Sequence, residues 1–328
     1  MFVLGKSLLA KSTRHKSGRT ALRLFLLAIL PTCSPSLLFK HSEAADAIQN
    51  TRRSSTEVYG PPTLLGHLKA REINESSGLV ASRTRGIYWT HNDSGDGPFI
   101  YAIDDKGALR GVWRVAGAGA RDWEDIAAGP GPDRQQRYLY VGDIGDNDSK
   151  RSEIVVYRFP EPLPVTNASK SNAPLTERAE AIRLRYPDGS HDAETLLVHP
   201  FTGDIYIITK ILLGKAVVYK ASPPFSAATT VLVHKAELNV PSLLGGLVTG
   251  GDISPDGRRV ALCDYLSGYE LLLPEGDSTF DDVWNQPFTK IDLGKQRQRE
   301  GIAYRQDGRA LLCTSEGVGA PLIQVVRR

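Results

Sequence analysis

Five acidic residues recur along the chain, and each begins a short apolar segment that runs into a turn. They are Glu75, Glu124, Glu194, Asp252 and Glu300, separated by 49, 70, 58 and 48 residues. Several carboxylates held close together favour a bound cation, because some of them would otherwise take up protons. Donor sets made only of oxygen suit Ca²⁺ better than Zn²⁺. The pattern therefore predicts a calcium site, provided that the fold brings the five acids together.

The elements that position these acids have the composition of β-strands. Short runs of Val, Ile, Leu and Tyr are bounded by Gly, Pro, Asp or Asn, and no amphipathic pattern of helical length occurs. One short helix is expected within 279–287. The predicted strands are 86–90, 99–103, 109–115, 137–141, 154–158, 205–208, 216–219, 231–233, 260–262, 310–312 and 322–326.

A turn follows each acidic strand, as in Ser254-Pro255-Asp256-Gly257. Such tight turns place the next strand antiparallel and adjacent. An acid, a strand, a turn, a second strand and two outer strands make one blade of a β-propeller. We predict an all-β fold, a five-bladed β-propeller whose ring is closed by the N-terminal strand within 63–70. Six blades stay open as an alternative, because the interval from Glu124 to Glu194 is long.

Polar residues also end each second strand, so one rim of the ring should gather oxygen donors. We expect Glu75, Glu124, Glu194 and Glu300 to share one register, with Asp252 displaced by one residue. Any single acid here could simply bind loop amides, but recurrence in five units favours a shared site. The predicted metal ligands are Glu75, Glu124, Glu194, Asp252 and Glu300. The predicted catalytic residues are His91, Glu124, Asp125 and Lys210. The predicted substrate-binding residues are Asn92, Asp93, Asp143, Arg299 and Glu316.

The first 47 residues predict an export signal. A basic region, a short apolar core around Leu24–Leu30 and the end Ala45-Asp46-Ala47 follow one another, as in secretory signal peptides. An uncut anchor is the alternative, although the apolar run is shorter than the ~20 residues of a membrane span. We predict a linker over residues 48–61 and the propeller over residues 62–328. We expect an exported monomer, periplasmic or extracellular, without a membrane span in the mature chain.

Charge and motifs exclude several classes of function. A chain cut after Ala47 carries 33 Lys and Arg against 35 Asp and Glu, which disfavours a nucleic-acid partner. The serine-hydrolase pattern GxSxG and the zinc-protease pattern HExxH do not occur. Cys263 and Cys313 show no metal-binding spacing, and they could form a disulfide or stay as two buried thiols.

Several segments resemble a family of exported bacterial β-propellers, largely uncharacterised. The resemblance covers about 72–328 and rests on RDWEDIA, YLYVGDIGDN, DAETLLVHP, GGLVTGGDISPDGRRVAL and EGIAY. The chain departs from it at Cys263-Asp264, where the family has a basic residue followed by Thr. The layout is also similar to that of the calcium-activated nucleotidases (apyrases) and of phytase-like propellers. The apyrase resemblance implies an axial Ca²⁺ held by inner-strand Glu and Ser, matched in placement by Glu75, Glu124, Glu194, Glu300 and Ser76.

Two functions are compatible with these features. The first is a calcium-dependent hydrolase of phosphate esters or other small anionic substrates, in which the metal lowers the pKa of a bound water. The second is a non-catalytic binding or scaffold propeller with a protein partner, in which the metal only stabilises the ring. A fold alone does not decide between them.

Overall fold

The computed structural model describes residues 58–164, 169–242, 245–276 and 279–328. The chain divides into two units, Met1–Arg52 and Arg53–Arg328, and the second contains the propeller. The predicted signal peptide and most of the predicted linker lie outside the described residues. Within the described ranges, no helix is long and apolar enough to cross a membrane.

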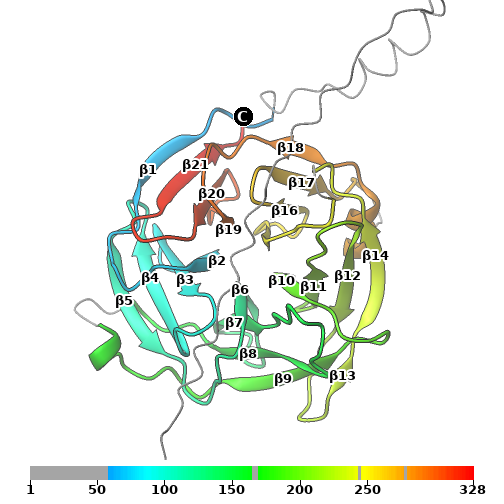
Figure 1. Cartoon of the computed structure of the whole chain (residues 1–328), viewed down its shortest axis with the longest axis horizontal. Helices are drawn as coiled ribbons and strands as arrows, with labels where there is room; N and C mark the ends of the chain where they lie inside the picture. Colours follow the sequence, from blue (N-terminus) through cyan, green and yellow to red (C-terminus); the bar gives the residue numbers. More distant parts are fainter. Residues whose placement is uncertain (1–57, 165–168, 243–244, 277–278) are drawn as a thin grey trace, which may run out of the picture. The chain divides into compact units, whose positions relative to one another are not determined.

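Five sheets surround a central axis (Figure 1), which confirms the all-β, five-bladed prediction. The inner strands of consecutive blades contact one another around the ring, and the last contacts the first. Blades 1 and 2 comprise β2 (Ser76–Ala81), β3 (Ile87–Asn92), β4 (Phe99–Asp104) and β5 (Leu109–Arg114), then β6 (Trp123–Pro130), β7 (Arg137–Asp143), β8 (Ile154–Pro160), β9 (Glu180–Arg185) and the short parallel β13 (Thr230–Val231). Blades 3 and 4 comprise β10 (Ala193–Val198), β11 (Ile205–Thr209), β12 (Ala216–Ala221) and β14 (Val233–Leu238), then β15 (Gly250–Ile253), β16 (Arg259–Cys263), β17 (Gly268–Leu272) and β18 (Thr289–Ile291).

Blade 5 is shared between the two ends of the propeller, as predicted. It contains β19 (Arg299–Tyr304), β20 (Ala310–Ser315) and β21 (Pro321–Val326), and β1 (Thr63–His67) pairs antiparallel with β21. This pairing covers an edge that would otherwise be open to other strands. The described residues of the long interval in blade 2 form no sixth blade. This interval holds the connection from β8 to β9, including the short 3₁₀ helix η1 (Lys170–Asn172).

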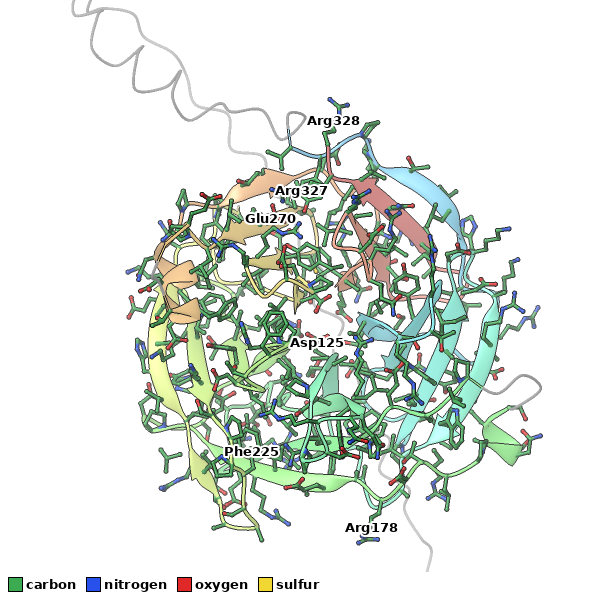
Figure 2. The ribbon with its side chains drawn as sticks, turned by 180° about the vertical axis from the view of Figure 1, so that it is seen from behind. Asp125, Arg178, Phe225, Glu270, Arg327 and Arg328 are labelled. Atoms are coloured by element: carbon green, nitrogen blue, oxygen red, sulfur yellow. The ribbon has the colours of Figure 1, made fainter. Side chains whose placement is uncertain are left out.

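A buried carboxylate reinforces the closure. Glu270 accepts hydrogen bonds from the hydroxyls of Tyr59 (2.6 Å) and Tyr304 (2.7 Å), and its other oxygen pairs with Arg327 (2.5 Å). Tyr59 precedes the first strand and Arg327 follows the last. Glu270 and Arg327 lie close together in Figure 2. This cluster therefore ties both ends of the propeller to blade 4.

The predicted turns form with the backbone conformation that their glycines allow. Gly86, Gly203, Gly257 and Gly308 follow the inner strands of four blades with φ between 65° and 76°, a region that favours glycine. The helix expected within 279–287 is the 3₁₀ helix η2 (Phe280–Asn285). Strands β9, β17 and β18 were not predicted, and the predicted strand 231–233 includes only the first residue of β14. Cys263 and Cys313 are buried free thiols.

Candidate metal centre

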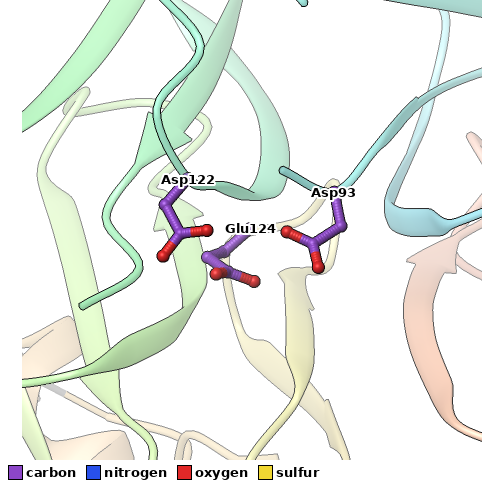
Figure 3. Close-up of side chains that lie close together, drawn as sticks. All are labelled: Asp93, Asp122 and Glu124. Atoms are coloured by element: carbon purple, nitrogen blue, oxygen red, sulfur yellow. The ribbon is translucent and has the colours of Figure 1, made fainter. Parts of the chain in front are cut away.

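Three carboxylates meet where blades 1 and 2 face the axis. Oxygen atoms of Asp93, Asp122 and Glu124 all lie within 4.8 Å of one another (Figure 3). Asp93 follows the end of β3, Asp122 precedes β6, and Glu124 is the second residue of β6. The five inner strands surround the axis of the ring, which is called the channel below. The end of this axis where the inner strands begin is called the acid mouth. It comprises Asp93, Asp122, Glu124, Glu194, Glu300 and Glu316.

The acids of this mouth act on one another. Burial and then the charges of Glu194, Asp93, Asp122 and Glu300 raise the pKa of Glu124 well above its usual value. Burial and the charges of Asp93 and Asp192 raise the pKa of Asp122 to about 6. Burial raises the pKa of Glu300 well above its usual value, with Glu194 the strongest charged contributor. Without a counter-ion, the folded site would therefore hold extra protons.

Lys210 balances part of this charge. Its ammonium pairs with Oε1 of Glu194 and lies 5.7 Å from the centre of the Tyr265 ring. Burial still raises the pKa of Glu194 to about 7, against the opposing effect of Lys210. The second oxygen of Glu194, Oε2, is buried and has no hydrogen-bond partner among the residues that the structure describes. A buried acceptor without a donor is costly, and a cation would satisfy it.

Backbone irregularities place the glutamates at this mouth. In three blades, the pairing of the innermost strand with the second strand shifts register. The shifts lie across Trp123/Asp125 in blade 2, Ala193/Thr195 in blade 3 and Arg299/Gly301 in blade 5. The residues skipped by these shifts are Glu124, Glu194 and Glu300. A β-bulge leaves one residue unpaired and re-aims its side chain, and bulges are frequent beside functional sites. The three glutamates therefore occupy equivalent, bulged positions in blades 2, 3 and 5.

The expected common register is wrong for Glu75. Its carbonyl accepts the N–H of Asp93, as the carbonyls of Asp192 and Gln298 accept the corresponding amides of Lys210 and Glu316. Glu75 is therefore equivalent to residues two positions before the glutamates. Its charge still contributes to the raised pKa of Glu316, for which burial is the main cause.

The one-residue displacement expected for Asp252 is also wrong. The pairing of β15 with β16 runs without a bulge, so Asp252 lies farther along its strand. Its Oδ2 accepts the N–H of Tyr304 at 2.8 Å, and the residue lines a cavity with the turns at the other end of the channel. Asp252 is therefore remote from the acid mouth along the strand direction.

Two predicted catalytic residues are enclosed by protein. The His91 side chain is 0 % exposed, packs edge-on against Trp123, and its pKa falls to about 4 because of burial. Asp125 lies near the middle of the ring (Figure 2), but it is 1 % exposed and accepts the N–H groups of Leu196 and Ile126. Both side chains are therefore enclosed by protein in this conformation, and their predicted catalytic roles stay predictions.

Three predicted substrate-binding residues are likewise used by the fold. Asn92 accepts the amides of Asn74 and Glu75. Asp143 pairs with Arg151 at 2.8 Å. Arg299 is 0 % exposed, and its guanidinium donates to Gln296 and to the carbonyl of Gly294. Asp93 and Glu316, in contrast, are partly exposed at the acid mouth.

Sequence reasoning missed Asp122 and Gly145. Asp122 precedes Glu124 by two residues, and the same spacing recurs in Asp192 and Glu194, a repeat that could have revealed both aspartates. A Cβ at Gly145 would lie 2.1 Å from Oε1 of Glu124 and 2.5 Å from Oδ2 of Asp122. The backbone at Gly145 therefore approaches the two carboxylates closely, and a side chain at this position would displace them.

No family model matches the chain, and no curated protein matches it. Among solved structures, it is similar to a crystal structure of a nidogen/laminin complex, with a TM-score of 0.42 and 13% identity over 74% of this chain and 73% of that one. It is also similar to the apo soluble aldose sugar dehydrogenase from Escherichia coli, with a TM-score of 0.40 and 11% identity over 82% and 99% of the two chains. Likenesses this distant carry no functional argument. The resemblance to apyrases and phytase-like propellers stays a prediction from short motifs.

Proposed function

We propose that this protein is an exported β-propeller that binds Ca²⁺ at the acid mouth. The observation that carries the proposal is the convergence of Asp93, Asp122 and Glu124 within 4.8 Å on two adjacent blades. The unpartnered Oε2 of the buried Glu194 supports it independently. Carboxylate oxygens without nitrogen or sulfur donors favour a hard cation, and Ca²⁺ tolerates irregular sites of six to eight ligands.

The residues that would hold the ion are Asp93, Asp122 and Glu124, with Glu194 and Glu300 contacting it directly or through water. The ion would replace the protons that these acids otherwise retain. Gly145 would keep the carboxylates of Asp122 and Glu124 accessible by leaving room for them. Glu75 and Asp252, which were predicted ligands, do not share the register of this set.

We propose further that the bound ion serves the hydrolysis of a small anionic substrate, such as a phosphate ester. The ion would supply Lewis-acid stabilisation of charge on the substrate and lower the pKa of a bound water. The pKa of Lys210 is raised, despite burial, by Glu194 and Tyr265. Lys210 would therefore stay charged and attract the anion. Glu316, which is partly exposed, would accept hydrogen bonds from neutral groups of the substrate, while Asp93 would hold the ion.

Calorimetric titration with CaCl₂ tests the binding step. We expect one site in the wild-type protein and at least about 10-fold weaker affinity in Glu124→Gln, because removing even a residue that supports a ligand costs this much. Glu237→Gln is the matched control, because Glu237 is exposed on the outer strand β14 and pairs with Lys215. Absence of heat for the wild type up to millimolar calcium would contradict the proposal.

A separate assay tests the hydrolytic step. Nucleotides, phosphate monoesters and lactones are each incubated with the protein in CaCl₂ or in chelator. Hydrolysis that requires calcium and is lost in Lys210→Met supports the enzyme. Calcium binding without turnover of any of these substrates would favour the alternative of a scaffold whose metal is structural.

A further inference from the structure

A cavity lies at the opposite end of the channel from the acid mouth, where the inner strands run into their turns. This turn mouth has a volume of about 400 Å³ and is lined by residues of all five blades. Each blade contributes at least one residue to the lining, among them Val80, Arg137, Phe201, Asp252 and Gln306. The cavity therefore lies on the axis, separated along the inner strands from the acid mouth.

Arg137 and Asp252 carry opposite charges and line this cavity from blades that are not neighbours, and the exposed Arg134 adds a second positive charge to the lining. Arg137 begins β7 in blade 2, and Asp252 lies in β15 of blade 4. Burial lowers the pKa of Arg137, and the charges of Glu161 and Asp252 oppose that effect. Within the described part of the chain, no ion pair joins Arg137 to Asp252. The two groups therefore act on each other across the cavity without touching.

Neither charged group is fully satisfied by its protein partners. The nearest acid to Arg137 is Glu161, at 3.8 Å from Nη1. Glu161 already accepts hydrogen bonds from Ser82 and Trp89. Among the described residues, the guanidinium of Arg137 makes no hydrogen bond, although such a group has five N–H donors. Asp252 accepts the backbone N–H of Tyr304 and is half-buried.

The remaining wall is largely apolar. Val80, Pro200, Phe201, Ile253 and Pro255 surround the two charges. Pockets of this kind, with apolar walls and a few convergent polar groups, are typical of small-molecule sites. A ligand that matches this lining needs a negative group for Arg137, a positive group for Asp252 and an apolar body.

We propose that the turn mouth is a binding site for a zwitterionic ligand of the α-amino-acid class with an apolar side chain. Its carboxylate pairs with Arg137, which suits planar carboxylates in a two-pronged geometry. Its ammonium pairs with Asp252, and its side chain packs against the apolar wall. This site is independent of calcium binding at the acid mouth.

Three ligands of similar shape test the proposal by calorimetry on the full propeller. L-Phenylalanine carries both charges, phenethylamine only the ammonium, and 3-phenylpropionate only the carboxylate. We expect L-phenylalanine to bind at least about tenfold more tightly than either analogue, because each analogue lacks one of the two charge-assisted hydrogen-bonding groups. Equal binding of the three, or binding of none, would overturn the proposal and leave an apolar or water-filled cavity.

Variants then assign the charges. Arg137→Gln should weaken L-phenylalanine and 3-phenylpropionate but leave phenethylamine unchanged, and Asp252→Asn should show the converse selectivity. Arg85→Gln is the control, because Arg85 is exposed and lines a different cavity. If Arg137→Gln does not fold, Arg137→Lys replaces it, because lysine keeps the positive charge but lacks the planar guanidinium. Loss of all three ligands in a folded Arg137→Gln variant would contradict the assignment.

Discussion

The two mouths of the channel are built from the same five inner strands, yet their chemistry differs. The acid mouth gathers six carboxylates around Lys210, whereas the turn mouth sets Arg137 against Asp252 within an apolar wall. Bulges explain the difference, because they turn Glu124, Glu194 and Glu300 out of the ladder where the strands begin. Past the bulge, regular pairing between the first and second strands of each blade returns. Blades of one fold can therefore present different chemistry at the two ends of their inner strands.

The largest effect on calcium affinity is expected at Gly145, whose backbone lies close to two carboxylates of the acid mouth. In Gly145→Ala, the new methyl group would lie 2.1 Å from Oε1 of Glu124 and displace the carboxylate. We expect calcium affinity to fall about 100-fold, the upper range for disturbing a ligand's support. Calorimetry measures this, with Gly60→Ala as control, because a Cβ there meets its nearest atom at 3.6 Å. Unchanged affinity in Gly145→Ala would show that the ion binds elsewhere.

The sequence predicted the fold more fully than the site. Strand composition, turn glycines and the unpaired segment 63–70 predicted five blades and their closure, because these signals are local or follow from unsatisfied edges. The site depends on register, and a bulge leaves no mark on composition. Glu75 and Asp252 have the sequence spacing of the repeat. Glu75, however, lies two positions before the residue equivalent to the three glutamates, and Asp252 belongs to a strand without a bulge.

Burial was the second property that the sequence could not supply. His91, Asn92, Asp143 and Arg299 all end or begin strands at the correct rim, and their polarity suggested chemistry. The structure instead uses them to connect neighbouring loops and blades. Asp93 and Glu316 occupy comparable sequence positions but remain partly exposed. Only the packing of adjacent blades distinguishes the two groups.

An effect of intermediate size is expected on the pH dependence of folding stability, which calcium should suppress. The pKa values of Asp122 (about 6) and Glu194 (about 7) lie above those of unfolded chains, chiefly through burial. The metal-free folded protein therefore binds more protons than the unfolded one from about pH 4 to 7, and its stability falls as pH rises through this range. Urea unfolding in chelator should show this fall, and CaCl₂ should flatten it. The same slope with and without calcium would contradict a shared site.

The smallest expected effect tests whether the two mouths are independent. Burial raises the pKa of Asp252 to about 7. Asp252 therefore also contributes to the fall in stability with rising pH. Its carboxylate lies outside the proposed calcium site, so calcium should not change this contribution. Asp252→Asn should reduce the slope equally in chelator and in CaCl₂. Calcium affinity should change less than about twofold, as expected for distant sites without shared partners. An affinity loss comparable to that of Gly145→Ala would mean that the ion lies between the mouths, and the distinction drawn from the bulges would fail.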